Sequence, residues 1–348
     1  VLGFYSVVGG WCTHYLLASL TGNPAADDPQ ALRAAFETFA ADPYEAAGCH
    51  VLFLSATALV VLAGVQKGIE RVGKVLMPLL FILMLVLIGR GLTLPGAMEG
   101  VKFLFKLDWE AFTGEALLNA MGFAFFSLSV GSGSMMNYGS YLSKDVNIGP
   151  ATLWIVVLAV MASVLGGLMI MPAVFAFGLS PDAGPGLTFA TMPAVFSHMP
   201  LGSFFAVLFF LSLFVAALTS AISILEMASQ HFVVRYGFTR RNAVLLVATG
   251  LGILGVFCAL SFGPLNGVKL FGLTLFEGLD YLTSNIGMPL GCLGIAVVGC
   301  WTAWPAIRAE LTKNGRWSEK GLAAFRLFAG ILAPILILVV AARGLGLF

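Results

Sequence analysis

Apolar residues recur along the chain in runs of about 20, which are separated by shorter polar segments. A helix rises roughly 1.5 Å per residue, so a run of this length crosses the bilayer core of about 30 Å. The runs are apolar on all sides rather than at alternate positions, which excludes a membrane β-barrel. The pattern therefore predicts an all-α integral membrane protein with about nine spans. We expect them at roughly 1–20, 50–65, 74–93, 114–142, 150–176, 203–234, 242–262, 278–303 and 323–343.

Basic residues gather in alternate loops, which orients the chain by the positive-inside rule. The loops after the second, sixth and eighth spans are basic, and the loop at 21–49 is acidic. The basic residues are Lys67, Arg71 and Lys74, then Arg235, Arg240 and Arg241, then Arg308, Lys313, Arg316, Lys320 and Arg326. These loops are predicted to be cytoplasmic, with Val1 inside and the C-terminus outside. Two outer loops, 94–113 and 177–202, are long enough to hold short helices.

Composition supports the membrane assignment and excludes other classes. Hydrophobic residues make up 59% of the 348, charged residues 10%, and the mean hydropathy is +0.97. Soluble domains carry about 25% charged residues. The net charge of +1 gives no indication of a nucleic-acid partner. The histidines and cysteines are scattered, with no HExxH, GxSxG or CxxC pattern, so an integral-membrane enzyme is not expected.

The fourth span contains a polar segment at its centre, from Ser127 to Gly133. Serine and glycine are poor helix formers, so this segment favours a broken helix. Unwound backbone at membrane depth is tolerated only where it lines a cavity or is buried in protein, and its freed carbonyls can bind ions or a carboxylate. The alternative is a small-residue packing face on an intact helix.

A second polar patch lies in the sixth span, from Ala216 to Ser223. Ala216 and Ser220 are four residues apart and therefore share a helix face. The Ala216 carbonyl with the Thr219 and Ser220 hydroxyls would form a hard oxygen site of the kind that suits Na⁺. From the residues alone, ordinary bonding of these hydroxyls to the helix backbone explains the patch better.

Several motifs follow one another along the chain, namely Gly68-Ile-Glu-Arg with Lys74-Val-Leu-Met-Pro-Leu-Leu-Phe, Phe125-Phe-Ser-Leu-Ser-Val-Gly with Tyr138-Gly-Ser-Tyr, and Ala217-Leu-Thr-Ser. Together they resemble the neurotransmitter:sodium symporters, in particular their bacterial amino-acid transporters. The resemblance implies two inverted five-helix repeats around a midplane site. It aligns Val1 with the family's third helix, so residues 1–348 would form a single transporter domain that lacks the first two helices. Such a fragment is not expected to transport alone.

The resemblance also implies roles for individual residues. Tyr5 matches a tyrosine that binds the substrate carboxylate, and Phe126 matches an aromatic gate over the substrate. The other implied substrate residues are Val1, Ser129, Gly131, Ser132 and Ile224. Ser127 matches a ligand of the first sodium ion, and Ala216, Thr219 and Ser220 match the second sodium site. Implied gating residues are Gly68 and Pro78, which form a Gly-x9-Pro motif, and Asp280, which matches an outer-gate acid.

Two departures from the family pattern bear on ions and substrate. Phe123 stands where the family usually has glutamine, and the segment 154–165 has no Asn, Asp or Glu where sodium- or chloride-related ligands usually lie. Ser132 stands where many relatives carry a bulky side chain, which leaves room for a large apolar or aromatic amino acid. The resemblance thus implies a sodium-coupled amino-acid symporter of a bacterial inner membrane.

Two other functions stay open. One is a proton-coupled permease of the same architecture, for which Glu226 is the only deep carboxylate. The other is a truncated membrane protein that does not transport.

Overall fold

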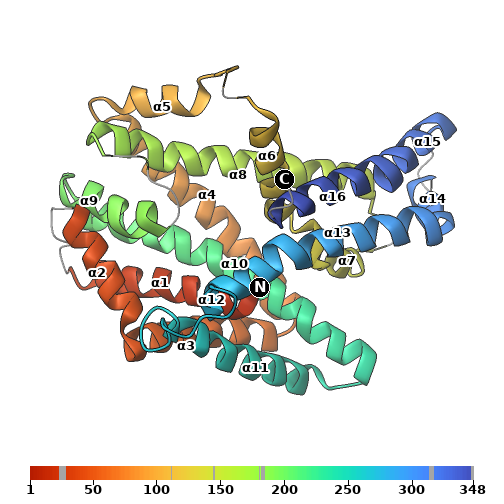
Figure 1. Cartoon of the computed structure of the whole chain (residues 1–348), viewed down its shortest axis with the longest axis horizontal. Coiled ribbons are helices and arrows are strands. Elements are labelled where there is room, and N and C mark those ends of the chain that lie inside the picture. The colour runs from red at the N-terminus through yellow and green to blue at the C-terminus, as the bar shows by residue number, and fades with distance from the viewer. Residues whose placement is uncertain are drawn as a thin grey trace. The chain divides into compact units, whose positions relative to one another are not determined.

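Figure 1 shows the computed structural model, which describes residues 1–22, 29–110, 112–143, 146–179, 181, 185–312 and 317–345. Apart from one isolated β-bridge between Leu270 and Leu273, the secondary structure of these residues is helical. Seven of their helices are long and apolar enough to cross a membrane. These helices are Pro43–Leu62, Val65–Leu92, Ile148–Ala176, Gly202–Tyr236, Arg240–Leu260, Leu275–Thr302 and Glu319–Gly344.

The two remaining predicted spans are also helical. The first span is α1, Leu2–Leu20, a helix of 19 residues. The span predicted at 114–142 is interrupted, and its pieces are α6 (Gly114–Ser127), η2 (Val130–Ser132) and α7 (Ser134–Gly139). Here η denotes a short 3₁₀- or π-helix. The predicted break at 127–133 is therefore confirmed.

The chain divides into two compact units, residues 1–106 with 162–279, and residues 107–161 with 280–348. The boundaries fall within α8 (Ile148–Ala176) and near the end of α12 (Leu275–Tyr281). The further helices of the first unit are α2 (Pro29–Ala41), α3 (Pro43–Leu62), η1 (Val65–Glu70), α4 (Arg71–Leu92), α5 (Ala97–Phe105), η3 (Leu187–Thr191), α9 (Met192–Ser197), α10 (Gly202–Tyr236) and α11 (Arg240–Leu260).

The core of the first unit forms where α1 packs against α3, α10 and α11. Glycines allow two close approaches, because a Cβ on Gly9 would lie 2.4 Å from the Phe53 ring and one on Gly10 would lie 2.7 Å from the His50 backbone nitrogen. Trp11 is buried in a cluster of four phenylalanine rings. α5, η3 and α9 occupy the two loops that were expected to hold short helices.

The connection between the second and third spans differs from the prediction. The basic segment 66–74 was expected to be a loop, but the structure is helical from Val65 onward through η1 and α4. The turn is confined to Ala63 and Gly64, whose φ of +94° suits glycine. Lys67, Arg71 and Lys74 lie within this helical segment because lysine and arginine are good helix formers.

The second unit contains α6, η2 and α7 together with the C-terminal helices. The latter are η4 (Leu282–Gly287), α13 (Met288–Val297), η5 (Val298–Thr302), α14 (Trp304–Thr312), α15 (Glu319–Leu327), η6 (Phe328–Leu332) and α16 (Ala333–Gly344). α13 packs against η2 and α16. Arg343 in α16 forms an ion pair with Glu115 at the start of α6. The broken span is thus held against α13 and α16.

Candidate functional site

The break in the fourth span depends on two left-handed residues. α6 ends at Ser127, and Ser129 then adopts φ +50° and ψ +34°. Gly133 has φ +80° immediately before α7 begins at Ser134. Glycine adopts this conformation freely, but a residue with a Cβ pays about 1–2 kcal/mol. Ser129 is therefore a strained residue in the predicted substrate region, where such strain is often functional.

Hydrogen bonds of serine hydroxyl groups stabilise the interrupted segment. The Ser132 hydroxyl donates to the Ser129 carbonyl at 2.9 Å and lies 2.8 Å from the Ser134 hydroxyl. The backbone N–H of Ser134 in turn donates to the Ser132 oxygen at 3.3 Å. These bonds satisfy backbone groups that the interrupted helix leaves without partners. Ser132, predicted only as a small residue beside the substrate, thus also stabilises the unwound segment.

Backbone contact with α13 fixes the position of the break within the second unit. A Cβ on Gly131 would lie 2.1 Å from the Met288 carbonyl oxygen, and one on Gly291 would lie 2.1 Å from the Gly131 carbonyl oxygen. Both positions therefore require glycine. Gly131 was predicted, but Gly291 was missed, because its only mark in the sequence is a glycine within an apolar span.

Phe126 lines a cavity of about 260 Å³ inside the second unit. Phe123 and Phe125 line it as well, and Ser284 and Asn285 of η4 contribute polar groups. Ser127, at the end of α6, is exposed. The cavity is thus mainly apolar, with polar groups from the eighth span. Sequence reasoning missed Asn285, although the run Thr283-Ser284-Asn285 is polar within that span.

In the first unit, α1 and α10 bring the predicted carboxylate-binding and sodium-binding residues together. The side chain of Tyr5 on α1 interacts with that of Ser220 on α10. The Thr219 hydroxyl donates to the Ala216 carbonyl at 3.0 Å. This bond is the ordinary backbone bonding that the residues alone favoured. It also holds two oxygens close enough to share one cation.

The other predicted substrate residues of this unit lie beside the same helices. Val1 accepts a hydrogen bond from the backbone N–H of Tyr5 at 3.0 Å and packs against the core around α1. Ile224 is half-buried one turn beyond Ser220 and packs against the core shared by α1, α3 and α10. Among the described residues, no group of three or more His, Cys, Asp or Glu side chains could hold a metal ion.

The predicted hinge residues lie at the start of the third span. Gly68 is buried in the π-helix η1, and a Cβ there would lie 2.2 Å from the Val60 carbonyl oxygen. Pro78 lies inside α4, where it removes a backbone donor. The segment between them is helical in this structure, and its π-helical turn is a less regular geometry than an α-helical one.

Two carboxylates that the sequence singled out have defined partners. The exposed Asp280 accepts a hydrogen bond from the Ser284 hydroxyl at 3.0 Å. Glu226 is only 1% exposed and pairs with Arg240 at 2.5 Å, and Arg240 also donates to the Val61 carbonyl at 2.9 and 3.1 Å. The Arg240 side chain therefore ties α10 and α11 to the end of α3. Arg240 was predicted only as a loop charge.

Comparison with known proteins agrees with this architecture. The family model described as the sodium:neurotransmitter symporter family matches residues 44–303. An uncharacterized sodium-dependent transporter of Bacillus subtilis, YhdH, is 42% identical over 299 residues, which are 85% of this chain and 66% of YhdH. An uncharacterized sodium-dependent transporter of Haemophilus influenzae is 35% identical over 302 residues, with the same shares of 85% and 66%. The chain thus spans about two thirds of the length of these curated relatives.

A solved structure resembles the fold over nearly the whole chain. The crystal structure of MhsT in complex with L-phenylalanine has a TM-score of 0.86 and 38% sequence identity, and the match covers 99% of this chain and 78% of MhsT. The family match covers more than half of the chain, and the fold similarity includes the broken span. The chain belongs to the sodium:neurotransmitter symporter family.

Proposed function

We propose that the full-length protein imports amino acids through a bacterial inner membrane in symport with Na⁺, by alternating access. The observation that carries this proposal is the group of oxygens on α10. The Ala216 carbonyl and the Thr219 hydroxyl are 3.0 Å apart, and the side chain of Ser220, the next residue, interacts with that of Tyr5. Oxygens of this kind suit a hard cation such as Na⁺. The sodium-dependent relatives support the same assignment.

The proposed roles follow the two units. In the first unit, Tyr5 binds the substrate carboxylate beside Val1 and Ile224, and Ala216, Thr219 and Ser220 bind one sodium ion. In the second unit, the hydroxyl of Ser127 binds the other sodium ion, and the unwound backbone at Ser129 to Ser132 binds the substrate. Phe126 closes over the substrate, and Gly68, Pro78 and Asp280 act in gating. Freed backbone groups in discontinuous helices are suited to such binding.

We propose further that the substrate is a large apolar or aromatic amino acid. Phe123 and Phe126 make the cavity of about 260 Å³ mainly apolar. Ser132 has a small side chain where many relatives carry a bulky one, which leaves room for a large substrate. MhsT, which is similar over 99% of this chain, was crystallised with L-phenylalanine. Competition for uptake tests this proposal, because phenylalanine and leucine should compete far better than glycine and alanine. Stronger competition by glycine or alanine would contradict it.

Uptake of a radiolabelled amino acid by the full-length protein tests the coupling ion. Uptake should require Na⁺ and should not be supported by K⁺. Thr219→Ala and Ser220→Ala should each raise the Na⁺ concentration for half-maximal uptake about tenfold, as expected for the loss of about 1.4 kcal/mol. Ser212→Ala is a matched control, because Ser212 is on the same helix and its hydroxyl donates to the Phe209 carbonyl at 2.7 Å and lies 4.0 Å from the Met169 sulfur. Equal uptake in Na⁺ and K⁺ would refute the proposal.

The proton-coupled alternative depends on Glu226. Its carboxylate receives two hydrogen bonds from Arg240, at 2.5 and 3.1 Å. This pairing gives Glu226 a structural role in joining α10 to α11, so its burial by itself does not favour proton coupling. A protein that does not transport would show no uptake in any cation, so the same assay distinguishes all three functions.

A further inference from the structure

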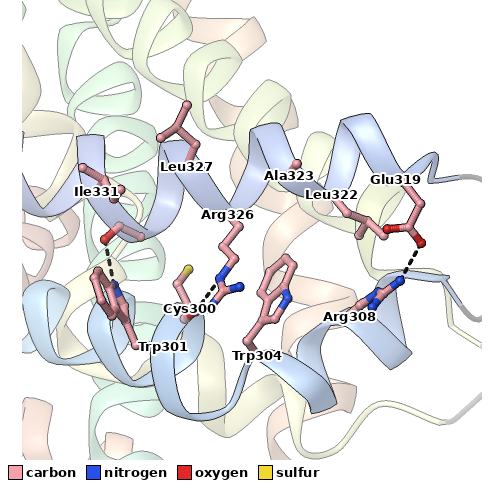
Figure 2. A pocket seen from close by; sticks show the side chains of 11 residues that line it. Cys300, Trp301, Trp304, Arg308, Glu319, Leu322, Ala323, Arg326, Leu327 and Ile331 are labelled. Carbon is pink, nitrogen blue, oxygen red and sulfur yellow. Dashed lines mark hydrogen bonds and ion pairs between the residues drawn. The ribbon is translucent and has the colours of Figure 1, made fainter.

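A second cavity, of about 430 Å³, lies between η5–α14 and α15–η6 of the second unit. Figure 2 shows it as a slot between two helical segments, and hydrogen bonds close both of its ends. At one end the Trp301 indole N–H donates to the Gly330 carbonyl at 2.9 Å. At the other end Arg308 and Glu319 form an ion pair at 2.6 Å. The proposed transport function uses none of these residues.

Local helix geometry explains why the cavity forms at this place. The segments touch at Gly330, where a Cβ would lie 2.8 Å from the Cys300 Cβ. Both segments are π-helical at this contact, over Val298–Thr302 and Phe328–Leu332, and such turns occur frequently at functional sites. Beyond this contact the two segments are connected by the Arg326–Cys300 hydrogen bond and, at the far end, by the Arg308–Glu319 pair. Defined contacts therefore bound the cavity at both ends.

The cavity is positively charged and contains an arginine that can bind an anion. The Arg326 guanidinium lies 5.2 Å from the centre of the Trp304 ring, and its Nε donates to the Cys300 carbonyl at 3.1 Å. No ion pair found within the described part of the chain includes Arg326. Its terminal nitrogens therefore remain able to bind an anion, and Arg308 adds a second positive charge that Glu319 offsets. A guanidinium is well matched to phosphate, which it binds in a bidentate manner.

The surroundings favour a lipid as the source of that phosphate. Trp301, Leu327 and Ile331 line the cavity and are 62%, 60% and 47% exposed, so apolar surface continues outward from the arginines. The positive-inside rule places the connection between α14 and α15 on the cytoplasmic side of the membrane. Tryptophan is common there at the level of the lipid headgroups. Basic pockets between membrane helices on that side bind anionic headgroups. We propose that this cavity binds the phosphate of an anionic phospholipid of the inner leaflet, with an acyl chain along Trp301, Leu327 and Ile331.

The test uses full-length protein stripped of lipid, with the dissociation constants of phosphatidylglycerol and phosphatidylcholine measured by native mass spectrometry. Phosphatidylglycerol should bind more tightly. Arg326→Gln should weaken its binding about fivefold, since each basic residue near anionic lipid contributes about this factor. Arg241→Gln is the matched control, because Arg241 is an exposed basic residue at the start of α11, in the other unit. An equal effect of the two variants would overturn the proposal.

Glu319→Gln supplies a test of opposite sign. Its side chain is 76% exposed, so the substitution should not impair folding, and it frees Arg308 from its countercharge. Binding of phosphatidylglycerol should therefore become several-fold tighter, whereas a purely structural role for the pair predicts no gain. A weaker or unchanged affinity would contradict the proposal even if Arg326→Gln failed to fold. Inorganic phosphate that displaced the lipid at equal concentration would show a site for free phosphate and would overturn the assignment to lipid.

Discussion

At the scale of single residues, Gly291 is the sharpest test of how the break is held. Gly291→Ala would place a Cβ 2.1 Å from the Gly131 carbonyl oxygen, and backbone on both sides limits how far the segments can move apart. We expect a loss of about 1–3 kcal/mol in stability. Gly294→Ala, on the same helix, has no atom within 4 Å of the added Cβ and should be neutral or stabilising by up to about 1 kcal/mol. Thermal unfolding of the purified full-length protein measures both, and equal melting temperatures would contradict this account.

The break also shows what can be inferred about residues from sequence. The serines and glycines at 127–133 predicted an interruption because their helix propensity is low, and α6 does end at Ser127. Gly131 was part of that segment. Its contact Gly291 lies 160 residues further along the chain, and no local pattern indicates which of the many glycines in apolar spans meets another backbone. Such pairings depend on tertiary packing and appear only in the structure.

At the scale of elements, the turn between α3 and α4 depends on Gly68. Gly68→Ala would place a Cβ 2.2 Å from the Val60 carbonyl oxygen at the end of α3, so α3 and η1 must separate. We expect slower transport and a melting temperature lower by several degrees, as for a loss of about 1–2 kcal/mol. Gly73→Ala, one turn into α4, has open space around the added Cβ and should resemble the parent protein. Transport rates of Gly68→Ala and Gly73→Ala that do not differ would argue against this close contact.

The buried pair of Glu226 and Arg240 connects three elements, α10, α11 and the end of α3. Glu226→Gln leaves the guanidinium, 29% exposed, without its countercharge, and should cost about 3–5 kcal/mol in stability. Replacing both partners with apolar residues should cost less than the sum of the two single changes, because no uncompensated charge remains. A double-mutant cycle followed by chemical unfolding measures the coupling. Additive effects would mean that the pair does not act as a unit.

Element positions were predicted better than element boundaries. All nine predicted spans correspond to helical segments, because runs of about 20 apolar residues are specific to membrane helices. The segment 66–74 was mistaken for a loop, since its charges resemble a boundary although they are compatible with a helix. The π-helices, such as η5 and η6, were not predicted. A π-helical turn inserts one extra residue into an α-helix. In a run that is apolar on every side, this insertion leaves the pattern of hydrophobic residues almost unchanged.

At the scale of the whole molecule, the predicted site residues belong to two separate groups. Tyr5, Ala216, Thr219 and Ser220 lie in the first unit, and the break at 127–133 lies in the second. Each group has its own local contacts, which are the Thr219–Ala216 hydrogen bond and the Tyr5–Ser220 contact in the first and glycine packing in the second. If the function is sodium-coupled transport, Na⁺ and the amino acid should each stabilise the group that binds them, and coupling should appear between the groups.

Hydrogen–deuterium exchange of the full-length protein can measure that coupling. Na⁺ alone should slow exchange in 216–224, since the proposed second sodium site lies on α10, and K⁺ should not. The amino acid should slow exchange in 125–134 only when Na⁺ is present. Linkage requires that Na⁺ strengthen amino-acid binding by the factor by which the amino acid strengthens Na⁺ binding. Thr219→Ala should weaken both effects together, and α11 serves as an internal control. Amino-acid protection of 125–134 that is equal in K⁺ would mean that the ion and substrate sites act independently, which a symporter cannot allow.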